Sequence, residues 1–394
     1  MPLLDGVRIL DLSQMLSGPY ASLILADMGA EVIKIESPGE GDRIRQMPPY
    51  FIGGFSAYFI SVNRNKKSVT IDLKMKEGRE VFYDLVKRSD VVMDNLRPGV
   101  LERLGADYET LRKVKPDIIQ VSITSYGYEG PYRDYPAFDL IIQAIGGAMS
   151  LTGEPGGAPV RMGIPMGDLA GAVFAANAIT AALYKRERTG QGTRADVSLL
   201  DALVSMHTYV AQYLLVGSPV PERLGSGHQS VVPYRAFKTS NGWLVVAVFA
   251  EKFWSSFCRA LEIEHLEKDP RFSTNALRCE HREELNSILE GIFATRTTEE
   301  WLKRLAEADV PAAPIQTLDR VLSDPQILLR NMVTDIDIPG HGRIRTLGNP
   351  VKVLGEREEF RPPPALGQHT EEILRGLLGY SKERIEELKA KRAI

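Results

Sequence analysis

One carboxylate in this sequence has the surroundings of a reactive group. Asp168 lies within residues 161–175, RMGIPMGDLAGAVFA, between a Gly/Pro-rich turn and an apolar run of small residues, where we expect a long helix to begin. An aspartate at a helix start is a favoured N-cap, because its side chain accepts hydrogen bonds from the first free N–H groups. It can also be a nucleophile, kept ionised by backbone donors and accessible because the neighbouring glycine leaves room for a ligand. The segment alone leaves both roles open.

Other residue types that commonly carry catalysis lack a comparable arrangement. No two of the six histidines have the i, i+4 spacing of a helical zinc pair, and neither Cys258 nor Cys279 lies in a nucleophile motif. No serine stands in G-x-S-x-G. We expect His207 to be a core histidine with a hydrogen-bond partner and His369 to stand at a helix start. His228 lies in a Gly-rich loop, where a structural role is favoured over a ligand role.

Several cations stand near the ends of predicted elements in the first half of the chain. The densest group is residues 63–67, NRNKK, directly before a predicted strand. Such a run is usually a solvated edge, but before a strand of a ligand-binding fold it can also capture a phosphate or carboxylate. Lys74, Arg97 and Arg103 occupy similar positions, so an anion-binding rim is possible here.

Composition limits the class of protein. The chain has 394 residues, 44% of them hydrophobic and 25% charged, which predicts two domains or one domain with a large insertion. A net charge of −3 gives no sign of a nucleic-acid partner. The sequence has two cysteines and no signal-peptide pattern, and no apolar run approaches the roughly 20 residues that span a bilayer. We therefore expect a soluble cytoplasmic protein without a membrane partner.

The first half of the chain alternates predicted strands and helices. Residues 7–12 and 31–36 read as strands joined by a helix over 17–29, which is a βαβ unit and requires parallel strands. The pattern recurs, with strands at 89–95, 117–123 and 194–199. The first turn, SQMLSGPYAS, lacks G-x-G-x-x-G, so we expect a nucleotide-type α/β fold that does not bind NAD.

The second half changes character. Residues 199–216 predict a helix that is apolar nearly all round, buried either in its own core or against a partner chain. The polar, Pro/Gly-rich stretch 218–230 marks a domain boundary. A hairpin turning at Asn241–Gly242 and several helices predict a small α+β domain. The expected division is 1–217 and 331–394 for a large domain, with 218–330 inserted as the small one.

Motifs along almost the whole chain resemble one family. They include LDGVRILDLSQMLSGPYASLILADMGAEVIKIE, VNRNKKSVTIDLK, DNLRPGVLERLG, ITSYGYEGP, FDLIIQAIGG, GDLAGA, VPYRAFKTSNGW and RPPPALGQHT. In this order they resemble the class III CoA-transferases of CaiB/BaiF type, the family that also contains formyl-CoA transferase, carnitine CoA-transferase and α-methylacyl-CoA racemase. VNRNKKS, GSGHQSVVPYRAFKT and RPPPALGQHT are most similar to the succinyl-CoA:dicarboxylate CoA-transferases.

The resemblance implies a fold and a partner. It implies a Rossmann-like large domain with a parallel sheet built from both chain ends, a small inserted α+β domain, and a homodimer whose chains interlock. It also implies CoA thioesters as substrates, with no tightly bound cofactor and no metal.

The resemblance assigns roles to particular residues. Asp168 falls on the nucleophilic aspartate of the family. The positions implied to bind CoA are Leu16, Ser17, Ile71, Asp72, Leu73, Lys74, Asn95, Leu96, Arg97, Arg103, Phe138 and Asp139. Gly225, Ser226, Gly227 and His228 fall on a glycine loop that covers the intermediate. A dicarboxylate leaves one free carboxylate, for which Arg64 and Arg278 are our candidate cations.

Differences from the family pattern refine the expected function. Leu16 stands where formyl-CoA transferase has Gln, and GSGH replaces its four glycines, which argues against oxalate and formate. Phe138 stands where the racemases have His, and Phe cannot move a proton. We therefore expect transfer of CoA from an acyl-CoA, such as succinyl-CoA, to a dicarboxylate through an aspartyl anhydride and an aspartyl-CoA thioester. The alternatives are a racemase-like isomerase and a non-catalytic CoA-binding subunit of a heteromeric transferase.

Overall fold

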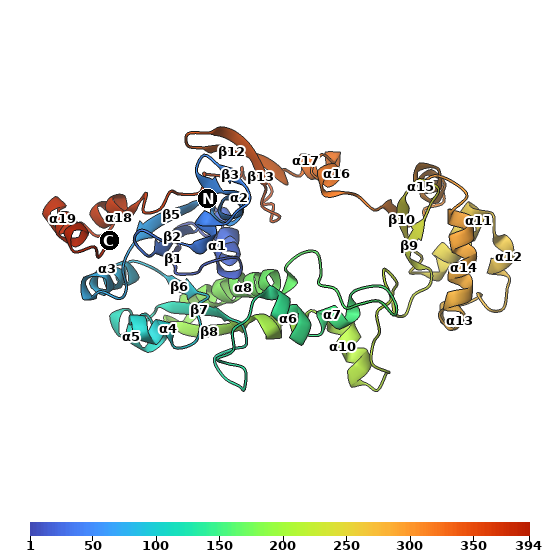
Figure 1. The fold of residues 1–394 in the computed structure, drawn as a ribbon, viewed down its shortest axis with the longest axis horizontal. Coiled ribbons are helices and arrows are strands. Elements are labelled where there is room, and N and C mark those ends of the chain that lie inside the picture. The colour runs from blue at the N-terminus through green and yellow to red at the C-terminus, as the bar shows by residue number, and fades with distance from the viewer. The chain divides into compact units, whose positions relative to one another are not determined.

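A six-stranded parallel sheet organises the chain in the computed structural model, which describes residues 1–394 (Figure 1). The strand order is β5-β2-β1-β6-β7-β8, and every neighbouring pair is parallel. In chain order this is 3-2-1-4-5-6, the order of doubly wound dinucleotide-binding folds. The strands are β1 (Arg8–Asp11), β2 (Glu31–Glu36), β5 (Lys66–Thr70), β6 (Val91–Asp94), β7 (Ile119–Thr124) and β8 (Thr193–Ser198). The predicted parallel α/β fold is confirmed.

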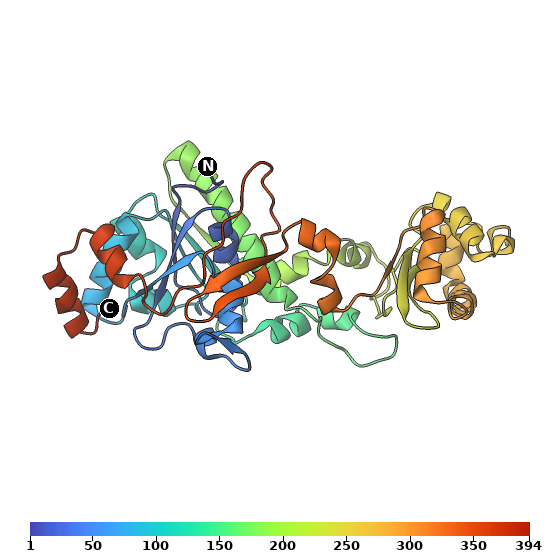
Figure 2. The same cartoon turned by 90° about the horizontal axis from the view of Figure 1, so that it is seen from above.

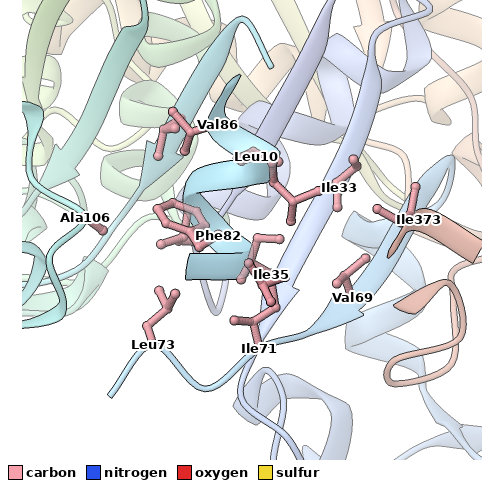
Figure 3. Packing of buried hydrophobic residues seen from close by; sticks show 14 of the residues in the cluster. Leu10, Ile33, Ile35, Val69, Ile71, Leu73, Phe82, Val86, Ala106 and Ile373 are labelled. Carbon is pink, nitrogen blue, oxygen red and sulfur yellow. The ribbon is translucent and has the colours of Figure 1, made fainter. Parts of the chain in front are cut away.

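Apolar helices cover both faces of the sheet. On one face, Phe82 and Val86 of α3 (Lys76–Lys87) pack against Leu10 and Ile33 of the central strands (Figure 3). On the other face lie α1 (Ser17–Asp27) and α8 (Met166–Thr189). Shorter helices complete this region: α2 (Ala57–Asn63), α4 (Val100–Leu104), α5 (Tyr108–Val114), α6 (Asp139–Ile145) and the 3-10 helix η1 (Arg43–Gln46).

Helix α8 is long and apolar enough, by length and composition, to cross a membrane. The sequence had been expected to contain no such segment. Its apolar character comes largely from alanines, of which Ala172, Ala175 and Ala176 are buried in the core with the sheet. A buried core helix meets the same test of length and composition, and Figure 2 shows α8 running alongside the sheet.

The expectation that both chain ends build the sheet is wrong. The C-terminal segment supplies a separate hairpin of β12 (Val333–Ile338) and β13 (Gly342–Leu347), followed by α18 (Thr370–Gly376) and α19 (Lys382–Ala390). It joins the edge strand β5 by single hydrogen bonds, such as the His369 N–H to the Ser68 carbonyl at 2.9 Å. Prolines 362–364 have no N–H with which to donate to a strand ladder. As expected, His369 stands at a helix start, directly before α18.

The chain divides into two compact units. The large unit comprises Met1–Ala148, Arg161–Val216 and Gln326–Ile394, and the small unit comprises Met149–Val160 and Gly217–Pro325. The sequence had not suggested that Met149–Val160 belongs with the small unit. A second two-stranded sheet, β3 (Phe51–Ile52) and β4 (Phe55–Ser56), and the short helix α7 (Ala148–Leu151) complete the first half.

The small unit is built on a three-stranded antiparallel sheet. Its predicted hairpin pairs β9 (Tyr234–Lys238) with β10 (Trp243–Ala247), and β11 (Ala312–Pro314) adds to β10. The Thr239 N–H bonds the Gly242 carbonyl at 2.9 Å, which confirms the predicted hairpin but centres its turn on Ser240 and Asn241. Its helices are α11 (Glu251–Leu261), α12 (Glu264–Glu267), α13 (Asn275–Glu280), α14 (Arg282–Phe293), α15 (Thr298–Glu307) and α16 (Leu318–Val321); α17 (Pro325–Leu329) follows at the boundary.

The apolar segment 199–216 is two helices rather than one. α9 (Leu199–Ser205) and α10 (Thr208–Leu215) meet at His207, whose Nε2 lies 2.6 Å from the Gly146 carbonyl, the partner expected for this histidine. α10 has no buried residue although nearly every one of its side chains is apolar. Burial in its own core, the first of the two alternatives, therefore holds for α9, where Leu199 and Leu203 are buried, and is wrong for α10.

Candidate active site

The loops after β1 and β6 meet at the point where the sheet reverses its strand order. In doubly wound folds, ligands bind in the crevice outside the carboxyl ends of the strands at this point. Asn95 joins the two loops: its Oδ1 accepts from the Gln14 N–H at 2.8 Å, and its Nδ2 donates to the Gln14 carbonyl at 2.6 Å and to Ser17 Oγ at 3.3 Å. The predicted ligand-binding residues of these two loops, from Leu16 to Ser17 and from Asn95 to Arg97, are thus brought together.

The remaining residues predicted at this edge divide into buried and exposed groups. Residues 71–74 follow β5, so they also lie at the carboxyl end of the sheet. Ile71 and Leu73 are buried in the core, so their backbone rather than their side chains would face a ligand. Asp72 accepts from the Lys74 N–H at 2.9 Å. By contrast Lys74, Arg97 and Arg103 are exposed, as an anion-binding rim requires.

Asp139, rather than Asp168, caps helix α8. Asp139 Oδ1 accepts from the Gly167 N–H at 2.8 Å and from the Asp168 N–H at 3.3 Å, and Oδ2 accepts from Gln143 Nε2 at 2.7 Å. Asp168 itself stands in the first turn of α8, and no protein group donates to its carboxylate. The capping role considered for Asp168 is therefore filled from another helix, and its own carboxylate is left without a structural role.

Gly167 permits this close contact between α6 and α8. A Cβ at residue 167 would lie 2.9 Å from Ile142 Cγ2 and 3.1 Å from Asp139 Oδ1, which is closer than a side chain tolerates. Phe138, directly before α6, is exposed and makes no side-chain capping hydrogen bond. Asp139, because it accepts from the N–H groups of Gly167 and Asp168, contributes to the site by holding the start of α8 in place.

The electrostatics of Asp168 differ from those expected. Burial first, and then the negative charge of Asp139, raise the pKa of Asp168 from its ordinary 3.8 to about 7. The expectation that α8 N–H groups keep it ionised is wrong, because Asp139 accepts from those N–H groups. A desolvated carboxylate with few hydrogen bonds is more basic and more nucleophilic than one in water.

Tyr58, which no sequence motif indicates, belongs to the same environment. It lies on α2, and burial together with the charges of Asp168, Asp42 and Asp139 raises the pKa of its hydroxyl to about 12. Tyr58 is therefore a neutral phenol that can donate a hydrogen bond near Asp168. No spacing in the sequence links residues 58 and 168, since the fold alone brings α2 towards α8.

The predicted glycine loop of the small unit is firmly held. Ser226 Oγ accepts from the Ala236 N–H at 2.9 Å, and the Gly225 N–H donates to the Gly153 carbonyl at 3.0 Å. Arg282 donates to the carbonyls of His228 and Gln229, at 2.8 Å each. Burial, and then the charge of Arg282, lower the pKa of His228, so this imidazole is neutral at pH 7. Arg282 thus holds the loop and keeps His228 uncharged.

Neither arginine predicted to bind a distal carboxylate is available for that role. Arg64 is 3% exposed; its Nε and Nη2 pair with Asp27 at 3.1 and 2.5 Å, and its Nη1 donates to the Leu347 carbonyl. Arg278 is 1% exposed and donates to the Val232 and Phe272 carbonyls and to Glu251. Both guanidinium groups join segments of the chain to one another, which corrects the role assigned to them from sequence.

Comparison with known proteins decides the family. Residues 4–370 match the model of the family described as CoA-transferase family III. This chain belongs to that family. It is accordingly an enzyme, a class III CoA-transferase, and CoA thioesters are its substrates.

The similarity covers nearly the full length of individual relatives. The chain is 42% identical over 386 residues to succinyl-CoA:glutarate CoA-transferase of Mus musculus, covering 98% of this chain and 88% of the relative. It is 41% identical to succinyl-CoA:mesaconate CoA-transferase of Haloarcula hispanica, covering 95% and 96%. The crystal structure of a CaiB/BaiF family protein from Brucella suis superimposes with a TM-score of 0.84 at 35% identity, covering 95% and 99%. The predicted family is thus confirmed.

Proposed function

We propose that this CoA-transferase moves CoA from succinyl-CoA to a dicarboxylic acid, with Asp168 as the nucleophile. The observation that carries the proposal is the Asp168 carboxylate, which is part-buried and raised in pKa while Asp139 takes over the capping of α8. A carboxylate with no structural duty, at the edge of the sheet where this fold binds its ligands, is the group best suited to attack an acyl carbon. The named relatives supply the substrate class.

The reaction conserves one activated acyl bond at every step. The Asp168 carboxylate attacks the thioester carbonyl; the C–S bond breaks, and a mixed anhydride and CoA thiolate form. The thiolate attacks the aspartyl carbonyl, which releases the donor acid and leaves an aspartyl-CoA thioester. The acceptor carboxylate attacks that thioester and expels the thiolate, and the thiolate then attacks the acceptor's acyl carbon, which regenerates Asp168. No step requires ATP or a metal.

The protein's own groups would support these steps in different ways. Asp139 holds the first turn of α8, so that Asp168 is fixed in direction. The neutral hydroxyl of Tyr58 is our candidate donor to the oxyanion that forms at the attacked carbonyl, because the first N–H groups of α8 are already bonded to Asp139. The exposed Lys74, Arg97 and Arg103 would bind the phosphates of CoA.

The racemase-like alternative is disfavoured by the same contacts. Racemisation needs a base on each side of the α-carbon. Asp139 accepts three hydrogen bonds, two of which hold α6 and α8 together, and Phe138 carries no titratable group. Deuterium exchange at the α-carbon of a branched acyl-CoA without an acceptor acid would reveal this activity.

We further propose that the chain works as a homodimer, in the interlocked form that the family resemblance implies. Large apolar side chains are exposed on α6, α8 and α10, among them Ile141, Phe174, Tyr209 and Leu215. Because monomeric proteins rarely expose extended apolar surfaces, a second copy of the chain is the proposed cover. Sedimentation should give a molecular mass twice that of one chain. The double variant Tyr209→Glu/Leu215→Glu should shift the measured mass towards that of the monomer.

The proposed function is tested by one assay with a chemical trap. Purified protein should convert succinyl-CoA and a panel of diacids, including glutarate and mesaconate, into the corresponding CoA thioesters, read by mass spectrometry. Hydroxylamine added during turnover should modify residue 168 and inactivate the enzyme. CoA exchange that continues without any modification of residue 168 would overturn the mechanism, and products only from monoacids would overturn the substrate class.

A further inference from the structure

The turn after β1 contains a backbone conformation that methionine rarely adopts. Met15 has φ +68°, in the left-handed region where a Cβ is disfavoured. It stands between Gln14, which Asn95 binds on both backbone groups, and Leu16, which precedes α1. A strained residue of this kind persists only where its surroundings hold it.

Asp42 and Lys34 hold the turn at Met15 and at Ser13 before it. Asp42 Oδ1 accepts from the Met15 N–H at 3.1 Å and from the Ile44 N–H at 3.2 Å. Its Oδ2 forms an ion pair with Lys34 Nζ at 2.9 Å, and both side chains are fully buried. Lys34 Nζ also donates to the Ser13 carbonyl at 2.7 Å. The pair therefore binds the strained residue, Met15, and also Ser13, two residues before it.

A second buried pair holds the helix that the turn leads into. Lys66 Nζ lies 3.4 Å from Asp11 Oδ2 and donates to the Pro19 carbonyl in the first turn of α1 at 2.9 Å. Asp11 accepts from the Ser13 N–H at 2.8 Å. Packing is tight here, since a Cβ on Gly18 would lie only 2.1 Å from Ser13 Cβ. Turn and helix start are thus fixed to one another.

We propose that Asp42 and Lys34 are positioning residues for acyl-CoA binding, which hold Met15 in its left-handed conformation and thereby place Leu16 and Ser17 at the ligand. The proposal rests on the proposed function, in that acyl-CoA is taken to bind at the switch point of the sheet. Buried ion pairs contribute little to stability compared with apolar residues, so a positional role accounts for a pair in this place. Neither residue needs to touch the substrate.

The test separates backbone strain from loss of side-chain packing. In Asp42→Asn the turn loses its charged anchor, and we expect the Kd for CoA and the KM for acyl-CoA to rise roughly tenfold while the KM for the acid stays within twofold. Adding Met15→Gly should recover most of that loss, because glycine adopts positive φ without strain. Adding Met15→Ala removes the same side-chain contacts but keeps a Cβ, so it should recover nothing. Calorimetric titration with CoA and steady-state kinetics supply both readouts.

Controls and a second background keep the outcome decisive. Asp107→Asn neutralises another carboxylate of the large unit, the N-cap of α5, and should leave the Kd for CoA unchanged. If Asp42→Asn fails to fold, the doubly neutral Lys34→Met/Asp42→Asn replaces it, and the Gly and Ala variants are compared in that background. Equal rescue by Gly and Ala, or unchanged CoA binding in Asp42→Asn, would refute the positioning role alone. Wild-type protein that binds no CoA would refute the proposed function as well.

Discussion

Two groups of acids in the large unit, one fully buried and one half-buried, have opposite electrostatics. Beneath the start of α1, Asp11 and Asp42 face Lys34 and Lys66, and these four charges cancel. Burial acts to raise the pKa of Asp11, but the nearby charges of Lys66 and Lys34 outweigh it and lower the pKa. At the start of α8, Asp168 faces only Asp139, and burial with this second negative charge raises its pKa to about 7.

The difference separates structural acids from a reactive one. A carboxylate that is paired with an ammonium and bonded to backbone N–H groups is stable and a poor nucleophile. A carboxylate left without a cation or a donor is costly to bury. This cost reduces the free energy of unfolding of the protein. Proteins accept such a cost at functional sites. The comparison predicts that removing Asp168 costs activity, whereas removing a partner from a paired group costs stability.

The largest expected effect is on catalysis by Asp168→Ala. We expect the transfer rate to fall by about 10⁴-fold or more, since the covalent intermediate cannot form. The Tm should not fall, because the side chain makes no stabilising contact. Steady-state kinetics and thermal unfolding measure the two effects. Asp107→Ala is the matched control: loss of the α5 cap should cost about 1 kcal/mol of stability without affecting the rate of the folded enzyme. An Asp168→Ala protein that still transfers CoA near the normal rate would show that Asp168 is not the reactive acid.

Arg64→Ala should have the reverse effect. The change leaves Asp27 buried without its partner, so the free energy of unfolding should fall by about 3–5 kcal/mol. The preference of the folded fraction for diacids over monoacids should remain, which urea unfolding and competition assays would show. Arg112→Ala, which removes an exposed pair with Glu109, should cost at most about 1 kcal/mol. A stable Arg64→Ala enzyme that had lost diacid preference would restore the role first expected of Arg64.

The raised pKa of Asp168 predicts how activity and stability depend on pH. kcat/KM for acyl-CoA should increase about tenfold per pH unit up to pH 7 and then level off, since only the ionised form attacks. The folded state binds this proton more tightly than the unfolded chain does, so stability should fall as pH rises from about 4 to 7 and stay reduced above it. Asp168→Asn should therefore be more stable than wild type at pH 8, by about 2–4 kcal/mol, and equally stable at pH 4. A rate independent of pH between 5 and 8 would contradict the assigned environment.

The smallest expected effect is that of Tyr58→Phe. Loss of one hydrogen bond to the developing oxyanion should reduce kcat by about 10- to 100-fold and leave the KM for acyl-CoA nearly unchanged. Tyr83→Phe, which removes a hydroxyl that bonds the Gly105 carbonyl, is the matched control and should not change kcat. Equal kcat values for Tyr58→Phe and wild type would exclude the hydroxyl as the oxyanion donor.

The sequence predicted those parts of the fold that depend on local pattern. Alternating apolar strands and helices between residues 7 and 124 dictate a parallel sheet, and the polar break that contains Asn241 and Gly242 specifies a hairpin, because neighbouring residues suffice for both. The segment 331–394 belongs to the large unit, as expected, but not to its parallel sheet, since its strand-like stretches carry no information on which sheet they join. They pair with each other as β12 and β13.

The sequence by itself determined that an aspartate with small neighbours begins the longest helix, and that it is a candidate nucleophile. Only the tertiary structure decided that Asp139, 29 residues earlier, caps that helix and leaves Asp168 without a structural role. It likewise decided that Arg64 pairs with Asp27, 37 residues away, and is buried out of reach of a substrate. The physical reason is the same in each case. Whether a charged group is reactive depends on which partners neutralise it, and those partners are brought close by the fold rather than by spacing along the chain.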